Sequence, residues 1–104
     1  MTEFRTFNDL IAEELKNDPE ACDLYLESAI EEYNENLNKK ALISALRHIS
    51  EAKGISKIAK KSGLSRETFY KSLSPNGNPR IETLFSIMKA FNYIPSIVAR
   101  KMPA

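Results

Sequence analysis

The sequence predicts a small all-α protein. Apolar residues recur at helical spacing through most of its 104 residues, and no segment shows the alternating apolar and polar pattern of a half-buried strand. A chain of this length is expected to form one compact domain, with no room for a separate catalytic domain. Its 42% apolar and 28% charged residues are typical of a folded globular protein and disfavour disorder and fibrous repeats.

Two helices are expected in the first third of the chain. Asn8 is expected to cap a short helix that runs to Lys16. Asp18 is the expected N-cap of a second helix, with Pro19 at its first position, and this helix is expected to end at about Tyr33. The apolar stripes that would face the core are Leu10, Ile11 and Leu15 in the first helix and Cys22, Leu26, Ala29, Ile30 and Tyr33 in the second.

A longer amphipathic helix is expected next. The polar residues 34–38 predict a linker, and a helix follows over residues 39–53, with Gly54 as its C-terminal stop. The positions of this helix that would face the core are Leu42, Ala45, Leu46, Ile49 and Ala52.

Two very short helices are then predicted, because glycine and turn-forming residues interrupt the pattern at close intervals. The first covers residues 56–62 with Ser56 as its N-cap, and the second covers residues 65–73 with Ser65 as its N-cap. Only two residues separate them, and the first of these is Gly63.

A last helix is expected over residues 81–91, after the turn-forming cluster at residues 74–79. Pro95 and Pro103 then disrupt the C-terminal tail. The apolar residues that this helix would pack onto the core are Leu84, Ile87, Met88 and Phe91.

Charge is divided unequally along the chain. Residues 1–38 carry eleven acidic and two basic side chains, a net charge of −9, whereas residues 39–104 carry thirteen basic and three acidic side chains, a net charge of +10. Such an asymmetry indicates a basic part that meets a polyanion and an acidic part that meets a different partner. We therefore divide the chain into an acidic helical extension, residues 1–38, and a second part, residues 39–104.

The two short helices have the spacing of a helix-turn-helix, which docks its second helix in the major groove of DNA. Ala59 is small enough for the close crossing of two helices, and Gly63 supplies a turn position where a positive φ costs little. The pattern alone leaves open a helical hairpin that binds nothing. The large residues that would fill the wedge between the helices are Ile55, Ile58, Leu64, Phe69 and Leu73.

The second short helix would read the DNA, and a local excess of Lys and Arg would neutralise phosphates. Arg66 lies in the first turn, where its guanidinium can bond a guanine through O6 and N7, and Lys71 projects toward the same groove. Tyr70 either touches DNA or seals the domain surface. The predicted DNA-binding residues are Ser56, Lys57, Lys60, Lys61, Ser65, Arg66, Glu67, Thr68, Tyr70, Lys71, Asn78 and Arg80.

One short recognition helix reads only a half-site of a few base pairs, so we expect a homodimer on a palindromic operator. The sequence offers one further observation on self-association. The tail residues Tyr93, Ile94, Ile97 and Val98 are more apolar than a free tail requires.

Catalytic and metal chemistry is not expected. His48 and Cys22 are the only histidine and cysteine, and they form no grouping with metal-ligand spacing. A nucleophilic Cys22–His48 pair lacks an orienting third group, so Cys22 is interpreted as a core residue. Glu31, Glu32 and Glu35 are interpreted as solvated charges. We expect no enzyme activity, cofactor or metal.

The sequence also predicts the compartment. It lacks both 18 consecutive apolar residues and a basic run followed by an apolar stretch at its start. A cytoplasmic protein without a membrane partner is therefore expected.

Residues 41–91 resemble the addiction-module antidote proteins, which are HigA-like antitoxins with a lambda-repressor-type (Xre-like) DNA-binding domain. The most specific part is SGLSRETFYKSLSPNGNPRIETL, in which a Gly-Leu-Ser-Arg-Glu-x-x-Tyr run at residues 63–70 leads into Leu-Ser-x-x-Gly-Asn-Pro at residues 73–79. The acidic residues 12–32 also resemble the N-terminal region of that family. The chain departs from the common helix-turn-helix pattern at Phe69, where Ile or Val is usual, and in lacking a Gln near the start of the first short helix.

The resemblance implies an all-α, lambda-repressor-like helix-turn-helix domain with an acidic helical N-terminal extension. It implies a type II antitoxin that neutralises a RelE/ParE-like (HigB-like) toxin and represses their shared operon. A basic part for operator DNA and an acidic part for a basic toxin would account for both charges. Two alternatives stay open: the acidic segment only completes the core, and the protein is a stand-alone phage-type repressor without a toxin partner.

Overall fold

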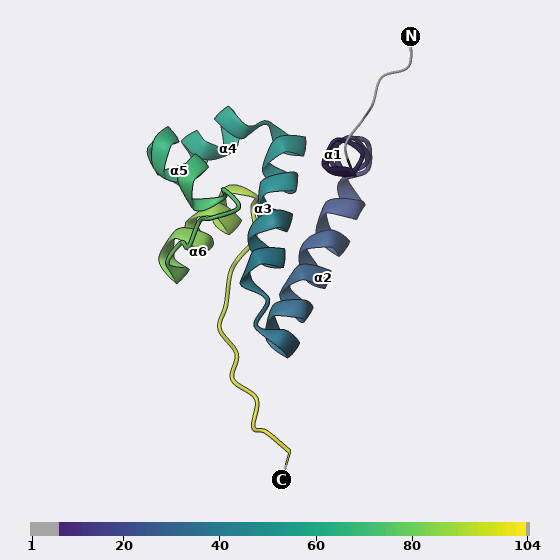
Figure 1. Cartoon of the computed structure of the whole chain (residues 1–104), viewed down its shortest axis with the longest axis vertical. Coiled ribbons are helices and arrows are strands. Elements are labelled where there is room, and N and C mark those ends of the chain that lie inside the picture. Colours follow the sequence, from purple (N-terminus) through teal and green to yellow (C-terminus); the bar gives the residue numbers. More distant parts are fainter. Residues whose placement is uncertain (1–6, 104) are drawn as a thin grey trace.

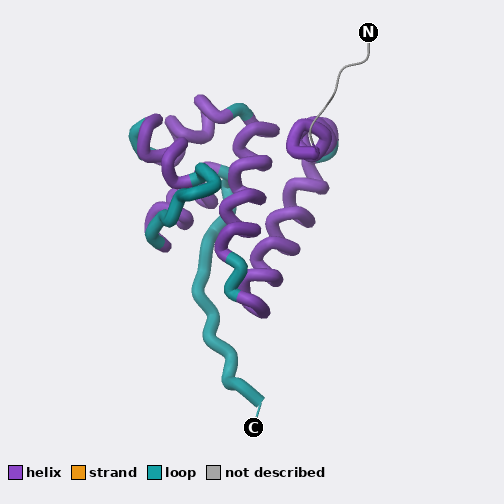
Figure 2. Tube along the Cα trace, viewed as in Figure 1, coloured by secondary structure: helices purple, strands orange, loops and turns teal. Residues whose placement is uncertain are grey.

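The computed structural model describes residues 7–103, and within this range it contains six helices and no strands (Figures 1 and 2). The all-helical character predicted from the periodicity is therefore confirmed for the described residues. None of these helices is long and apolar enough to cross a membrane.

The first two helices are α1 (Phe7–Asn17) and α2 (Pro19–Asn36). α1 begins before Asn8, so the prediction that Asn8 is its N-cap is wrong. Asp18 is the N-cap of α2, as predicted: its side chain accepts a hydrogen bond of 3.1 Å from the backbone N–H of Glu20. Pro19 stands at the first helical position, where its missing N–H costs nothing.

α2 continues three residues beyond the predicted end at Tyr33, so the expected linker over residues 34–38 shrinks to two residues. Leu37 closes the helix in the left-handed conformation, with φ 53°, and donates its N–H to the carbonyl of Tyr33 at 2.8 Å. Asn38 is then the N-cap of α3 (Lys39–Lys53), accepting a hydrogen bond of 3.1 Å from the N–H of Ala41. The bounds of α3 are those predicted.

Three short helices follow: α4 (Ile55–Ser62), α5 (Arg66–Ser72) and α6 (Ile81–Ala90). Ser56 does not cap α4, because the helix starts at Ile55 directly after Gly54 and has no side-chain cap. Ser65 does cap α5, as predicted. Leu73 and Phe91 follow the last helical residues of α5 and α6 as C-caps, one residue from the expected ends.

One hydrophobic core joins all six helices. α3 runs through the centre, with α1 and α2 on one side and α4, α5 and α6 on the other (Figure 1). Ala45, Leu46 and Ile49 of α3 are completely buried. The acidic segment contributes Leu15, Cys22, Leu26 and Ala29 to this core. Burial of each large apolar side chain stabilises the fold by about 1.5 to 3 kcal/mol, so α1 and α2 are an integral part of it.

Candidate functional site

The turn between α4 and α5 has the geometry that its sequence predicts. Gly63 adopts φ 74° and donates its N–H to the carbonyl of Lys60 at 3.3 Å. Ser62 tightens the turn, because its hydroxyl donates to the carbonyl of Ala59 at 2.6 Å and accepts from the N–H of Leu64 at 3.2 Å. The left-handed position therefore falls on a residue without a Cβ.

The predicted apolar wedge holds the two helices together. Ala59 is buried, and its small side chain allows α4 and α5 to pack closely. Phe69 anchors α5 in the core, with 1% of its surface exposed. The remaining wedge residues divide into two that are buried, Ile58 and Leu73, and two that are partly buried, Ile55 and Leu64. The opposite side of α5 is left facing solvent.

The start of α5 is fixed by a reciprocal pair of hydroxyl groups. The Ser65 hydroxyl accepts a hydrogen bond of 3.1 Å from the backbone N–H of Thr68 and donates one of 2.8 Å to the Thr68 hydroxyl. Ser65 thus positions the helix, and its single proton is already shared with Thr68.

Arg66 in the first turn of α5 lies against Tyr70 one turn later. Its guanidinium carbon is 5.6 Å from the centre of the Tyr70 ring, a cation–π arrangement. The Tyr70 ring meets the buried Phe69 ring edge to face, at 6.3 Å between centres and an interplanar angle of 89°. Tyr70 is 43% exposed. Its ring contacts both the buried Phe69 ring and the Arg66 guanidinium.

Two contacts that the sequence analysis did not identify hold the end of α5. Arg47 of α3 donates to the carbonyl of Leu73 at 2.8 Å. Gly77 packs so closely on the last turn that a Cβ there would lie 2.4 Å from the carbonyl oxygen of Ser72. The only sequence signal for this contact is the position of Gly77 within the Leu-Ser-x-x-Gly-Asn-Pro run.

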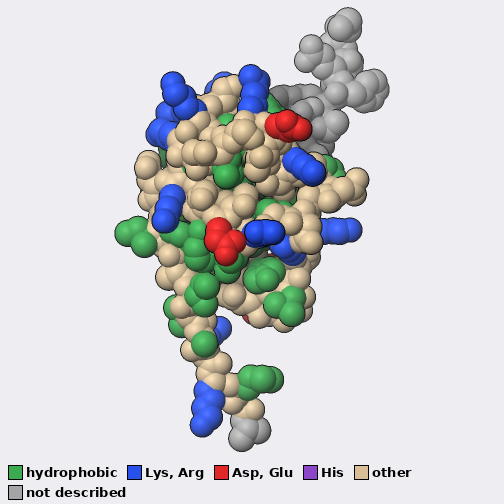
Figure 3. Space-filling view, turned by 90° about the vertical axis from the view of Figure 1, so that its left-hand side faces the viewer, with side chains coloured by type: hydrophobic (Ala, Val, Ile, Leu, Met, Phe, Trp, Pro, Cys, Tyr) green, Lys and Arg blue, Asp and Glu red, His purple; other side chains and the backbone are tan. Residues whose placement is uncertain are grey.

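All twelve predicted DNA-binding residues are exposed, and they lie on α4, on α5 with its cap, and in the segment that leads into α6. Figure 3 views this side of the molecule and shows Lys and Arg side chains spread over it, with few acidic ones between them. Asn78 already has a partner on α3, because Lys39 donates to its side-chain oxygen at 2.5 Å.

Three lysines surround a small hollow of about 160 Å³ where α4 meets the end of α6. Lys57 and Lys61 of α4 were predicted site residues, and Lys53 at the end of α3 joins them. The four-residue spacing of these lysines along the chain was the available signal. Three ammonium groups around one hollow suit a phosphate or another anion.

The opposite side of the molecule carries acids. Leu24 on α2 is 63% exposed, and helical spacing places three acidic residues on the same side of this helix. These acids, all exposed, are Glu20, Glu31 and Glu35. An exposed apolar residue among acids is a surface suited to a basic partner with an apolar contact.

The buried titratable groups belong to the core rather than to either surface. Tyr25 and His48 share a hydrogen bond of 2.7 Å between the hydroxyl and Nδ1, and their rings stack at 5.8 Å. Burial lowers the pKa of His48, assisted by the Arg47 cation, and burial raises the pKa of Tyr25. Burial also raises the pKa of Cys22, whose exposed fraction of 3% confirms its prediction as a core residue.

Comparison with known proteins gives one family. Residues 3–99 match the family model described as "Probable addiction module antidote protein". A Haemophilus influenzae protein described as uncharacterized is 42% identical over 82 residues, which is 79% of this chain and 79% of that protein. No solved structure matches.

Proposed function

This chain belongs to the addiction module antidote family, and from that premise we propose that it is the DNA-binding antitoxin of a type II toxin–antitoxin module. Membership of an antidote family implies a toxin partner. In this proposal, residues 39–104 form a lambda-repressor-type helix-turn-helix domain that represses its own operon. The acidic residues 1–38 neutralise a RelE/ParE-like (HigB-like) toxin.

The observation that carries the DNA-binding half is the placement of α5. One side of this helix is anchored in the core by Phe69, and the other presents Arg66, Tyr70 and Lys71 to solvent. A short anchored helix with polar side chains outward is what docking in a major groove requires. We assign Arg66 and Lys71 to base edges, with Glu67 and Thr68 beside them on the same helix.

The surrounding polar residues are assigned to the DNA backbone. α4 supplies Ser56, Lys57, Lys60 and Lys61, and Arg80 stands at the start of α6. Lys53 joins this group through the hollow that it shares with Lys57 and Lys61. Phosphate neutralisation by such side chains supplies most sequence-independent affinity for DNA. Ser65 orients α5, and Asn78 is assigned to a phosphate next to its Lys39 contact.

Two copies would bind together, since one seven-residue helix reads only a half-site. The operator is then palindromic, with half-sites about one helical turn apart. Specificity comes from the sum of the two half-sites.

The toxin half of the proposal rests on the outer face of α2. Glu20, Glu31 and Glu35 share one side of this helix with the exposed Leu24, and none of these four residues belongs to the core. This face can therefore bind a basic protein without unpacking the fold. Because α1 and α2 also bury Leu15 and Leu26 against the rest of the molecule, the role of this face is best tested by surface substitutions and not by deletion.

The DNA-binding half is tested by fluorescence anisotropy on the duplex upstream of this gene and on a scrambled duplex of equal length and composition. We expect the wild-type protein to prefer the upstream duplex and to lose affinity steeply as salt rises. Lys60→Ala should weaken binding to both duplexes and reduce the salt slope by about 1 for each bound copy, whereas Lys16→Ala on α1 should change neither. Equal, salt-insensitive binding of the wild type to both duplexes would refute the assignment.

The toxin half predicts that a small basic protein is encoded beside this gene, and it is tested on that protein. Affinity-tagged neighbour and this chain, produced together, should co-purify as a complex. If the tagged neighbour purifies without this chain, while this chain binds the operator normally, the protein is a stand-alone repressor of phage type.

A further inference from the structure

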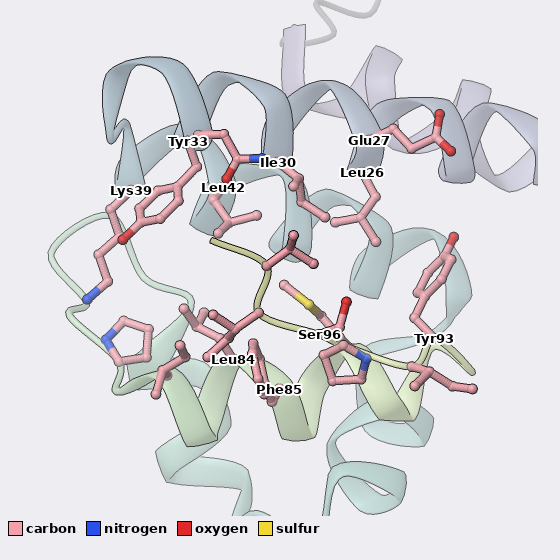
Figure 4. Close-up of a pocket in the computed structure, with 18 of the residues that line it drawn as sticks. Leu26, Glu27, Ile30, Tyr33, Lys39, Leu42, Leu84, Phe85, Tyr93 and Ser96 are labelled. Carbon is pink, nitrogen blue, oxygen red and sulfur yellow. The ribbon is translucent and has the colours of Figure 1, made fainter. Parts of the chain in front are cut away.

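A long groove lies between α2, α3, α6 and the C-terminal tail, with a volume of about 740 Å³ (Figure 4). Its middle is apolar: Ile30 of α2 and Leu42 of α3 face Leu84 and Phe85 of α6. Its two ends carry charge, with Glu27 near Tyr93 at one end and Lys39 near Tyr33 at the other. The groove is distinct from the basic surface on α4 and α5.

The tail beside this groove exposes an unusual amount of apolar surface. Ile94, Ile97, Val98 and Met102 have exposed fractions of 94%, 73%, 77% and 85%. Residues 93–103 form neither helix nor strand, and within the described chain no backbone hydrogen bond involves a residue beyond Tyr93. Exposed apolar side chains on an extended backbone with free N–H and C=O groups mark a segment that pairs with another chain.

We propose that this groove is the docking site for residues 94–102 of a second copy of the chain, so that two copies exchange tails across a two-fold axis. The chain's own tail lines the groove from Tyr93 to Val98 but leaves its volume unfilled. A second tail supplies apolar side chains that can fill this apolar volume. When each copy places its tail in the groove of the other copy, the result is a closed, self-complementary dimer.

Charge sets the direction of the second tail. The tail of the chain starts at the acidic end of the groove, where the Tyr93 hydroxyl donates to Asp23, and runs past Ser96 toward the Lys39 end (Figure 4). A two-fold axis perpendicular to the tails makes the second tail antiparallel to the first. The basic residues Arg100 and Lys101 of the second copy then lie at the end that carries Asp23 and Glu27. These opposite charges favour the antiparallel arrangement.

The backbone fits the same arrangement. Pro95 and Pro103 bound a run of seven residues that all carry an N–H. Two such runs side by side in antiparallel orientation can form a short two-stranded ladder, in which alternate side chains enter the two grooves. This pairing would satisfy the N–H and C=O groups of alternate residues, which have no backbone partner within the described chain.

The inference supplies the contact surface for the dimer of the proposed function, and so it rests on that proposal for its biological role. Its test measures mass in the absence of DNA. A failure of tail exchange therefore leaves the DNA-binding result unaffected, and a failure of DNA binding leaves the mass unaffected.

The experiment is sedimentation equilibrium of the full chain and three single variants. Ile97→Asp places a charge on the tail. Ile81→Asp places one on the groove wall, at the first residue of α6, where a negative charge suits the helix dipole. Leu24→Asp makes the same change at an exposed apolar residue outside the groove. Helicity by circular dichroism identifies any variant that fails to fold.

We expect the wild type and Leu24→Asp to be dimers, and both Ile97→Asp and Ile81→Asp to dimerise about 100-fold more weakly while remaining folded, because the symmetric dimer loses two apolar contacts at once. A monomeric wild type overturns the proposal. Ile97→Asp and Ile81→Asp dimers as tight as the wild type also overturn it, as does a tail variant that dissociates while the groove variant does not. If Ile81→Asp unfolds, Tyr33→Asp on the α2 wall replaces it and is read by the same criterion.

Discussion

The guanidinium of Arg66 rests on the ring of Tyr70, 5.6 Å from its centre, and its Nη2 donates to the Tyr70 hydroxyl at 3.5 Å. The ring in turn leans on the buried Phe69. This stack limits the orientations of a long side chain before any ligand arrives, so less conformational entropy is lost when Arg66 binds. In the proposed DNA complex, Arg66 is therefore the residue of α5 whose orientation is most restricted before binding.

Replacing Arg66 by Ala should reduce the preference for operator over scrambled DNA by about 5- to 150-fold for each half-site, since each copy loses one bidentate contact worth about 1 to 3 kcal/mol. Tyr70→Ala should cause a smaller loss of preference, because Arg66 keeps its charge but loses the aromatic ring against which it lies. Tyr70→Phe retains that ring and should keep most of the preference. Competition binding with both duplexes measures this ratio. An Arg66→Ala variant that weakens both duplexes equally would assign Arg66 to a phosphate instead.

Gly77 should tolerate no side chain. Its Cβ would lie 2.4 Å from the Ser72 carbonyl oxygen and 2.6 Å from that of Lys71, and both are backbone atoms at the end of α5. Gly77→Ala should lower the free energy of unfolding by about 1 to 3 kcal/mol, the usual cost of overpacking. Urea denaturation measures the change, with Asn76→Ala at the exposed neighbouring position as the control. Equal stability of the two variants would show that the turn shifts freely.

His48 should make stability depend on pH. Burial lowers its pKa in the folded state, from 6.5 in the unfolded chain, so between these two values the unfolded state binds a proton that the folded state does not. The contribution of His48 is complete above about pH 6.5 and is lost as the pH falls toward the folded-state pKa. Urea midpoints at several pH values should fall more steeply for the wild type than for His48→Gln across this range. Parallel curves for the two proteins would contradict the assignment.

Much of the fold follows from local signals in the sequence. Asp18 before Pro19, Asn38 before the third helix, and Ser65 each precede a helix and cap it with a side-chain oxygen. The two wrong N-caps have a common cause. At Asn8 and Ser56 the residue type suits a cap, but the helix begins before that residue: α1 at Phe7, and α4 at Ile55, directly after Gly54. Residue type alone does not fix the first turn of a helix.

The contacts that complete the candidate site depend on residues far apart in the chain. Arg47 holds the end of α5 from a position 26 residues away, and Lys39 reaches Asn78 across 39 residues. No periodicity or local spacing encodes such pairs. The groove has the same origin, because it exists only once α2, α3 and α6 are packed together. The apolar tail was visible in the sequence, but the groove that we propose as its docking site was not.

The assignment of this protein as an antitoxin is tested most directly by growth of cells that express, from an inducible promoter, the small basic protein expected to be encoded beside this gene. The wild-type chain should restore growth, whereas the double variant Glu20→Lys/Glu31→Lys on the outer face of α2 should not restore it. The matched double variant Glu51→Lys/Glu82→Lys makes the same change in charge on exposed residues of α3 and α6, and it should restore growth as the wild type does. A neighbour that is toxic alone and stays toxic with abundant, folded wild-type chain would contradict the account.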